Sequence, residues 1–205
     1  MTEPHATRPG TDGAEYTERL QRLGGAGWKR VLDVQAPYRW NIRRLRLGRT
    51  LDVGCGIGRN LAHLGGNGVG VDHNPTSIEA CRAQGLEAYT IDEFLASDVA
   101  RPGAFDAMLA AHLLEHMDEP AARAVIESYL PYVRPGGQVV FITPQERGFA
   151  SDATHVRFVG FPEAADMARA LGLSVRRQYS FPFPRFAGRA FTYNEFVTVA
   201  RRDAV

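Results

Sequence analysis

The chain of 205 residues carries 24 Lys and Arg against 23 Asp and Glu, so its formal net charge is +1. A near-neutral chain has no general electrostatic attraction to nucleic acid or to an anionic membrane, and neither is an expected partner. No apolar run approaches the ~20 residues that cross a bilayer, and the first residues lack the apolar core of a secretory signal. Two cysteines, Cys55 and Cys81, are too few to indicate a disulfide framework. We therefore expect a cytoplasmic protein with one domain.

The amino-terminal part of the sequence is polar at first and then becomes helical in pattern. Residues 1–13 are rich in polar residues, Pro and Gly, and predict a mobile tail. Apolar residues then recur at helical spacing over 16–23 and 28–47, where Pro37 breaks the second stretch. The predicted divisions are a tail at 1–13 and a single domain at 14–205, made of a helical cap at 14–48 and a core at 49–205.

The core alternates between short apolar segments and helical ones. Strands are predicted at 50–53, 68–71, 88–91, 105–110, 138–143, 174–181 and 191–200. Helices are predicted at 59–64, 76–83, 93–97, 121–133 and 162–171. Such alternation indicates a mostly parallel α/β sheet with helices on both faces. The last two strands have no helical pattern between them, so they predict an antiparallel hairpin at the sheet edge.

A glycine-rich loop follows the first predicted strand in the segment LDVGCGIGR. Gly54, Gly56 and Gly58 leave room for a ligand to approach the backbone, which side chains would prevent. The spacing is G-x-G-x-G and not the G-x-G-x-x-G of dinucleotide-binding folds, and Asp52 lies two residues before the first glycine. A tight turn without a ligand is the alternative interpretation.

Two further acids follow the next two predicted strands. Asp72 ends the segment GVGVD, at roughly the 20-residue distance where a carboxylate can accept both hydroxyls of a ribose. Asp92 follows the third strand in YTIDEF, where a carboxylate can accept the exocyclic amine of an adenine. The loop and the acids together predict a nucleoside-containing cofactor.

Five segments, LDVGCGIGR, GVDHNP, FDAMLAAHLLEH, RPGGQVVFITP and NEFVTVARR, resemble the class I S-adenosylmethionine-dependent methyltransferases over about residues 51–201. The resemblance implies a Rossmann-like seven-stranded sheet of order 3-2-1-4-5-7-6, with the last strand antiparallel, and S-adenosylmethionine as cofactor. The glycine loop would approach the methionine part, Asp72 the ribose and Asp92 the adenine. The implied cofactor-binding residues are Asp52, Gly54, Cys55, Gly56, Asp72, His73, Asp92 and His112.

The segment HLLEHMDEP follows the fourth predicted strand and places His112, Glu115 and His116 at i, i+3 and i+4. On a helical turn these positions share one face, at the sheet edge where such folds bind ligands. A later histidine, His155, follows the fifth strand, and imidazole and carboxylate ligands together suit a divalent cation. The four residues predict a metal site for Mg²⁺ or a transition metal. A segment that shapes the cofactor pocket without a metal is the alternative.

This pattern of x-x-Glu-His with a later histidine resembles the metal-assisted O-methyltransferases, among them the ubiquinone-pathway enzymes and the small-RNA 3′-end 2′-O-methyltransferases. Those families have Glu where this chain has His112. A shell of mixed His and Glu ligands favours transition metals, whereas Mg²⁺ prefers an all-oxygen shell. A cation there would lower the pKa of an acceptor hydroxyl. Unligated, His116 or His155 would suit a general base. The predicted catalytic residues are therefore Glu115, His116 and His155.

The acceptor is predicted from aromatic and arginine residues near both ends of the chain. Rings beside Arg suit a polyhydroxylated ligand, although such rings also pack hairpins against sheets. The ending FPFPRFAGRAFTYNEFVTVARR is similar to that of methyltransferases associated with bacterial polysaccharide synthesis. The predicted substrate-binding residues are Tyr16, Trp28, Arg30, Tyr179, Arg185 and Tyr193.

The sequence thus predicts methyl transfer from S-adenosylmethionine to a hydroxyl on a sugar or oligosaccharide in polysaccharide biosynthesis, with help from a divalent metal. An RNA 2′-hydroxyl and a phenol or quinone precursor stay open as acceptors, and so does a non-catalytic S-adenosylmethionine-binding regulator. The expected partner is a small-molecule or oligosaccharide acceptor, and a homodimer is an open assembly state.

Overall fold

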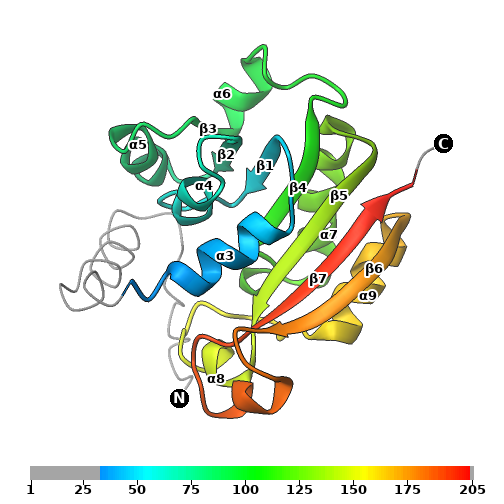
Figure 1. Cartoon of the computed structure of the whole chain (residues 1–205). Coiled ribbons are helices and arrows are strands. Elements are labelled where there is room, and N and C mark those ends of the chain that lie inside the picture. Colours follow the sequence, from blue (N-terminus) through cyan, green and yellow to red (C-terminus); the bar gives the residue numbers. More distant parts are fainter. Residues whose placement is uncertain (1–32, 204–205) are drawn as a thin grey trace, which may run out of the picture.

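The computed structural model describes residues 33–203, and Figure 1 shows a seven-stranded sheet within that range. The strands lie in the order β3-β2-β1-β4-β5-β7-β6. Their bounds are β1 Thr50–Val53, β2 Gly68–Asp72, β3 Ala88–Thr90, β4 Phe105–Ala111, β5 Val133–Pro144, β6 Leu173–Phe181 and β7 Glu195–Arg202. Strand β7 pairs antiparallel with both β5 and β6, whereas β3, β2, β1, β4 and β5 pair in parallel. The predicted order, and the antiparallel last strand, are confirmed.

Helices connect these strands. Their bounds are α3 Ala36–Arg44, α4 Arg59–His63, α5 Pro75–Ala83, α6 Ile91–Ala96, α7 Glu119–Tyr129, α8 Glu146–Phe149 and α9 Phe161–Ala170, with 3-10 turns η1 Leu114–His116, η2 Leu130–Tyr132 and η3 Arg185–Arg189. Pro37, predicted as a break, lies in the first turn of α3, where its missing N–H costs nothing. Within residues 33–203, no helix has both the length and the apolar character needed to cross a bilayer.

The two faces of the sheet are covered by different helices, because side chains along a strand alternate in direction. In β4, Leu109 belongs to a buried cluster with Ile42 of α3. The next residue back, Met108, belongs to another cluster with Ile126 of α7 and Met167 of α9. Figure 1 shows α3 on one side of the central strands and α7 and α9 on the other. Strand β1, which is fully buried, and strand β4, in which every residue except Asp106 is buried, are therefore fixed from both sides.

Some predicted bounds differ from the structure for local reasons. Strand β3 ends at Thr90, because the Thr90 hydroxyl accepts the Glu93 N–H and caps α6. Asp92 consequently lies in the first turn of α6. Strand β7 begins at Glu195, not at residue 191, because the chain after β6 forms the turn η3 before it enters the sheet. Helix α8 and turn η3 are elements that the sequence patterns did not predict.

One edge of the sheet gathers the chemically relevant segments. The parallel strands β1, β2 and β4 end there, which brings the glycine loop, Asp72 and His112 to the same edge. Because β7 runs in the opposite direction, its first residue, Glu195, also lies at this edge beside Pro144. The carboxyl edge of the sheet is therefore the place to examine for a site.

Candidate functional site

The glycine loop after β1 is held close to the end of β2. The N–H of Gly54 donates to the carbonyl of Val71 over 2.8 Å, and the N–H of Gly56 donates to Asp72 Oδ2 over 2.8 Å. Gly54 has φ +74°, and a Cβ at this position would lie 2.8 Å from Leu113 Cδ1. The loop therefore needs glycine both for its conformation and for its close approach to the segment after β4.

Asp72 is a fixed, ionised carboxylate. Its oxygens accept the Gly56 N–H and, over 2.9 Å, the Asn74 N–H, and His73 Nδ1 lies 3.3 Å from Oδ1. Burial alone would raise the pKa of Asp72, but the His73 and backbone hydrogen bonds outweigh burial and lower it. A carboxylate held in this way at the end of β2 is suited to accept hydroxyl groups from a ligand.

Asp52 is a second buried acid, directly below the loop in β1. Its side chain is 1% exposed, and among the described residues neither carboxylate oxygen has a hydrogen-bond partner. Burial, and then the nearby charge of Asp72, raise the pKa of Asp52 to about 8. A buried acid without a partner is costly, and a cationic ligand group would satisfy it.

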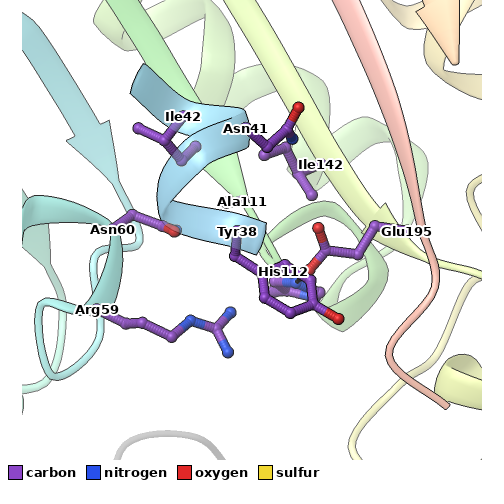
Figure 2. A pocket seen from close by; sticks show the side chains of 9 residues that line it. All are labelled: Tyr38, Asn41, Ile42, Arg59, Asn60, Ala111, His112, Ile142 and Glu195. Carbon is purple, nitrogen blue, oxygen red and sulfur yellow. Dashed lines mark hydrogen bonds and ion pairs between the residues drawn. The ribbon is translucent and has the colours of Figure 1, made fainter. Parts of the chain in front are cut away.

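A small pocket opens between the glycine-loop helix, α3 and the end of β4 (Figure 2). The Arg59 guanidinium points toward Tyr38 and His112, and Glu195 faces His112 from β7. The Tyr38 hydroxyl donates to the carbonyl of Tyr193 over 2.7 Å and so ties α3 to the segment before β7. The pocket thus places a cationic side chain, Arg59, and an anionic one, Glu195, close to one another. Its lining residues are Tyr38, Asn41, Ile42, Arg59, Asn60, Ala111, His112, Ile142 and Glu195.

His112 lies between two carboxylates. Its Nε2 is 2.9 Å from Glu195 Oε1, and its Nδ1 is 3.3 Å from Glu115 Oε1. Its backbone has φ +56°, which lies outside helical geometry, so His112 precedes the turn η1 that contains Glu115 and His116. Burial alone would lower the pKa of His112, but the ion pairs with Glu115 and Glu195 outweigh burial and raise it to about 9.

Three other predicted ligands converge beyond His112. Glu115, His116 and His155 each offer one ligand atom, and these atoms lie within 4.8 Å of one another. Glu115 is fully buried, and neither of its carboxylate oxygens has a hydrogen bond within residues 33–203. The Glu115 carbonyl accepts the N–H groups of Val156 and Arg157, at 2.8 and 3.2 Å, which joins η1 to the segment that carries His155.

Hydrogen bonds fix which ring nitrogen of each histidine in this group is free. The Thr154 hydroxyl donates its single proton to Asp152 Oδ1 over 2.8 Å, so it can only accept from His116 Nδ1, 3.1 Å away. His155 Nδ1 lies 2.9 Å from the carbonyl of Phe149, which also can only accept. Both histidines therefore carry a proton on Nδ1, so Nε2 is the nitrogen with a free lone pair in the neutral ring. Burial lowers the pKa of His116 and keeps that ring neutral.

Free Nε2 lone pairs beside a buried carboxylate without hydrogen bonds fit a divalent cation, because such ligands must be deprotonated and oriented by outer hydrogen bonds. The residues around Asp72 and Asp52 fit a nucleoside cofactor with a cationic group.

A family model described as a methyltransferase domain matches residues 15–189. The chain belongs to this methyltransferase family.

Two proteins with related sequences are also named methyltransferases. The ubiquinone biosynthesis O-methyltransferase of Ralstonia nicotianae is 28% identical over 186 residues, which is 76% of this chain and 77% of that protein. The protein with the same name from Alkalilimnicola ehrlichii is 35% identical over 106 residues, which is 46% of this chain and 41% of that protein.

Two solved structures with low identity share the fold. A SAM-dependent methyltransferase from Archaeoglobus fulgidus has a TM-score of 0.66 at 17% identity and covers 91% of this chain and 99% of its own. Magnesium protoporphyrin IX methyltransferase from Synechocystis with bound SAM has a TM-score of 0.62 at 13% identity and covers 94% of this chain and 93% of its own. The protein is a class I S-adenosylmethionine-dependent methyltransferase.

The cofactor residues predicted for this methyltransferase occupy three kinds of position. Asp52, Gly54, Cys55, Gly56 and Asp72 lie together at the ends of β1 and β2. His73 follows Asp72 and is about half exposed, and Asp92 is exposed in the first turn of α6. His112 lines the pocket of Figure 2.

The predicted metal and substrate residues are brought together only in part. His112 is not in the group formed by Glu115, His116 and His155, because its two ring nitrogens face carboxylates. The Tyr179 hydroxyl donates to Asn41 Oδ1 on α3. Of the remaining predicted substrate residues, Arg185 is paired with Glu146, and Tyr193 is 57% exposed. Tyr16, Trp28 and Arg30 lie outside the described residues.

Several site residues of the methyltransferase were not predicted. Arg59 directly follows the glycine loop, and its position alone could have suggested it. Thr154 is adjacent to His155, but its contact with His116 depends on the fold. Glu195 lies 83 positions after His112, and no spacing in the sequence indicates that the two residues meet.

Proposed function

We propose that this protein transfers a methyl group from S-adenosylmethionine to a hydroxyl of a small aromatic acceptor with two neighbouring oxygens, such as a catechol, with the help of a divalent cation. The observation that carries the proposal is the group of Glu115, His116 and His155, whose ligand atoms lie within 4.8 Å of one another. It lies beside His112, which also lines the pocket next to the cofactor loop.

The cofactor would bind along the carboxyl edge of the sheet. In this proposal Asp72 would accept the ribose hydroxyls, and Asp92 would accept the adenine amine. The methionine end carries an ammonium and a carboxylate, and the pocket of Figure 2 offers Arg59 for the carboxylate. Asp52, which is buried and has no hydrogen bond from any residue of 33–203, suits the ammonium. When bound, S-adenosylmethionine supplies a methyl group on a sulfonium, so the protein chiefly has to align the acceptor.

Glu115, His116 and His155 would hold the cation, which lowers the pKa of a bound hydroxyl and orients it. Three protein ligands leave coordination positions for two acceptor oxygens, which favours a vicinal pair of oxygens. The two histidines are half-buried, so the group is accessible, while Glu115 is fully buried. This arrangement supports transfer to an oxygen that must be deprotonated first.

A metal-free version uses the same residues. The unprotonated Nε2 of His116, held by Thr154, has the lone pair that a general base needs. His155 is oriented in the same way by the Phe149 carbonyl. In this version a chelator has no effect on transfer, whereas His116→Ala still abolishes it.

The aromatic acceptor is preferred over the sugar for three reasons. Two matching relatives are named ubiquinone biosynthesis O-methyltransferases, and that name favours a phenolic acceptor over a sugar. The rim of the metal group is also aromatic, since the His155 ring stacks on Phe149 at 5.3 Å and Phe149 contacts Phe158 at 5.4 Å. Arg185, expected to bind sugar hydroxyls, is already paired with Glu146. The sugar and RNA acceptors become arms of the test.

The test is a transfer assay with S-adenosylmethionine labelled in the methyl group. Catechol, phenol, a methyl glycoside and a short single-stranded RNA are offered in turn, each with and without a chelator. The proposal expects label in the catechol product, at least about 100-fold less with phenol, and loss of transfer with chelator. Label in the glycoside or the RNA in preference to catechol would contradict the proposed acceptor. Binding of S-adenosylhomocysteine, measured separately, shows that the protein is folded.

A further inference from the structure

The predicted metal site lacks one ligand because His112 is engaged elsewhere. Its Nε2 lies 2.9 Å from Glu195 Oε1, while its Nδ1 lies 3.3 Å from Glu115 Oε1. With a carboxylate at each nitrogen, the ring has no free nitrogen to offer to a cation. His112 therefore contacts the metal group only through Glu115.

Glu195 is fixed in place by the sheet. It is 7% exposed and is the first residue of β7, where it pairs with Pro144 of β5 and with Phe181 of β6. Its carbonyl accepts a hydrogen bond of 2.9 Å from the Gln145 side chain. With its backbone held on both sides, Glu195 presents its carboxylate to His112, beside which it lies in Figure 2.

We propose that Glu195 is a positioning residue that fixes the His112 ring and, through it, the Glu115 carboxylate, and that the site built around this carboxylate prefers a transition metal ion such as Co²⁺ or Zn²⁺ to Mg²⁺. The inference rests on the metal role in the proposed function. The ligands of this site are two imidazole nitrogens and one carboxylate, from His116, His155 and Glu115. Imidazole suits transition metals, whereas Mg²⁺ prefers oxygen ligands and octahedral geometry.

Glu195 also acts on Glu115 through the same ring. The Glu115 carboxylate has no hydrogen bond among the described residues, so its ion pair with His112 is the contact that orients it. Loss of the Glu195 carboxylate would release the His112 ring and, with it, the Glu115 oxygens. Outer residues of this kind typically change metal affinity by about 10–100-fold when they are replaced.

The experiment is isothermal titration of tag-free, metal-stripped full-length protein with CoCl₂, ZnCl₂ or MgCl₂ alone. We expect Co²⁺ and Zn²⁺ to bind at least about 100-fold more tightly than Mg²⁺. In Glu195→Gln the Co²⁺ affinity should fall by about 10-fold or more. In the double variant His112→Glu with Glu195→Gln, an oxygen ligand stands beside Glu115, and the preference over Mg²⁺ should shrink by about 10-fold. Glu127→Gln, an exposed acid on α7, is the matched control and should bind like wild type.

S-adenosylhomocysteine binding confirms that each variant is folded. If Glu195→Gln does not fold, Glu195→Asp replaces it, because this change withdraws the carboxylate by one methylene. Mg²⁺ binding as tight as Co²⁺ binding in wild type, or wild-type Co²⁺ affinity in the folded Glu195 variants, would overturn this inference and leave the proposed function standing. A folded wild type that binds none of the three cations would instead overturn the metal role on which both rest.

Discussion

At the scale of single residues, the site is marked by two buried acids whose oxygens have no hydrogen bond among the described residues, Asp52 and Glu115. A buried acid without a hydrogen bond is costly for folding, although Glu115 does form an ion pair with His112. Each lies where a cationic species would bind, the first under the cofactor loop and the second in the metal group. Ligand chemistry therefore explains both residues better than packing does.

Gly54 provides a test of how closely the loop must approach its neighbours. In Gly54→Ala the new Cβ would lie 2.8 Å from Leu113 Cδ1, in addition to the strain at φ +74°. Gly85 is the matched control, because it has φ +73° and nothing within 4 Å of the same position. Gly85→Ala should cost roughly 1 kcal/mol of unfolding free energy, and Gly54→Ala roughly 2–4 kcal/mol.

Urea unfolding of the two glycine variants measures the difference, and titration with S-adenosylhomocysteine measures the effect on the loop. Only Gly54→Ala should weaken S-adenosylhomocysteine binding, by at least about 10-fold. This factor corresponds to a loss of about 1.4 kcal/mol of binding free energy. Equal losses of stability in both variants, with binding intact, would show that Leu113 simply moves aside.

The positions of Asp72 and Gly54 could be predicted from the sequence because their spacing to the strands is local. Asp72 and Gly54 directly follow strands, so placing the strands also placed the residues. The pair of Glu195 with His112 could not be predicted, because it depends on β7 entering the sheet beside β5. The turn η1 also begins after His112, so the assumption that one helical face carries both His112 and Glu115 was wrong, although the two side chains still meet.

At the scale of elements, the order of the sheet followed from alternation of strands and helices, but the bounds depended on capping and on tertiary contacts. Helix α6 illustrates this, since Thr90 caps it and Phe94 anchors it. Helix α8 and turn η3 have no period long enough to predict them. They exist because the segments after β5 and β6 pack on one another, with Arg185 paired to Glu146.

Phe94 tests the anchoring of α6. It is fully buried, and its ring lies 5.1 Å from Tyr132, 5.9 Å from Tyr129 and 6.5 Å from Phe105. Phe94→Ala should lower the unfolding free energy by about 3–5 kcal/mol, because it removes apolar contacts and leaves a cavity. Leu95→Ala, at a neighbouring position that is 57% exposed, should change it by less than about 0.5 kcal/mol. Similar losses in both variants would mean that α6 is not anchored through Phe94.

At the scale of the whole molecule, stability should fall in mild acid because of His63. This side chain is 5% exposed, and burial, with the nearby charges of Arg59, Arg39 and Arg43, lowers its pKa from 6.5 to about 4. The folded state therefore resists protonation that the unfolded state accepts. The stability is fully present above pH 6.5 and is lost progressively as the pH falls toward 4, by about 2 kcal/mol at pH 5.

The measurement is urea unfolding at pH 7.5 and at pH 5 for wild type and for His63→Gln, which keeps a polar side chain but cannot gain the charge. The difference between the two pH values should be smaller in the variant by about 2 kcal/mol. An identical pH dependence in both proteins would show that other groups control the acid sensitivity.

The carboxyl edge of the sheet is where the proposed cofactor residues and the proposed metal group lie side by side. The most direct test is a crystal structure with S-adenosylhomocysteine and Co²⁺, in which the anomalous signal locates the ion. The proposed function predicts one strong peak at ligand distance from Glu115 and from Nε2 of His116 and His155, with the ribose hydroxyls on Asp72. An ion at another place, or a cofactor that makes no contact with Asp72, would contradict it.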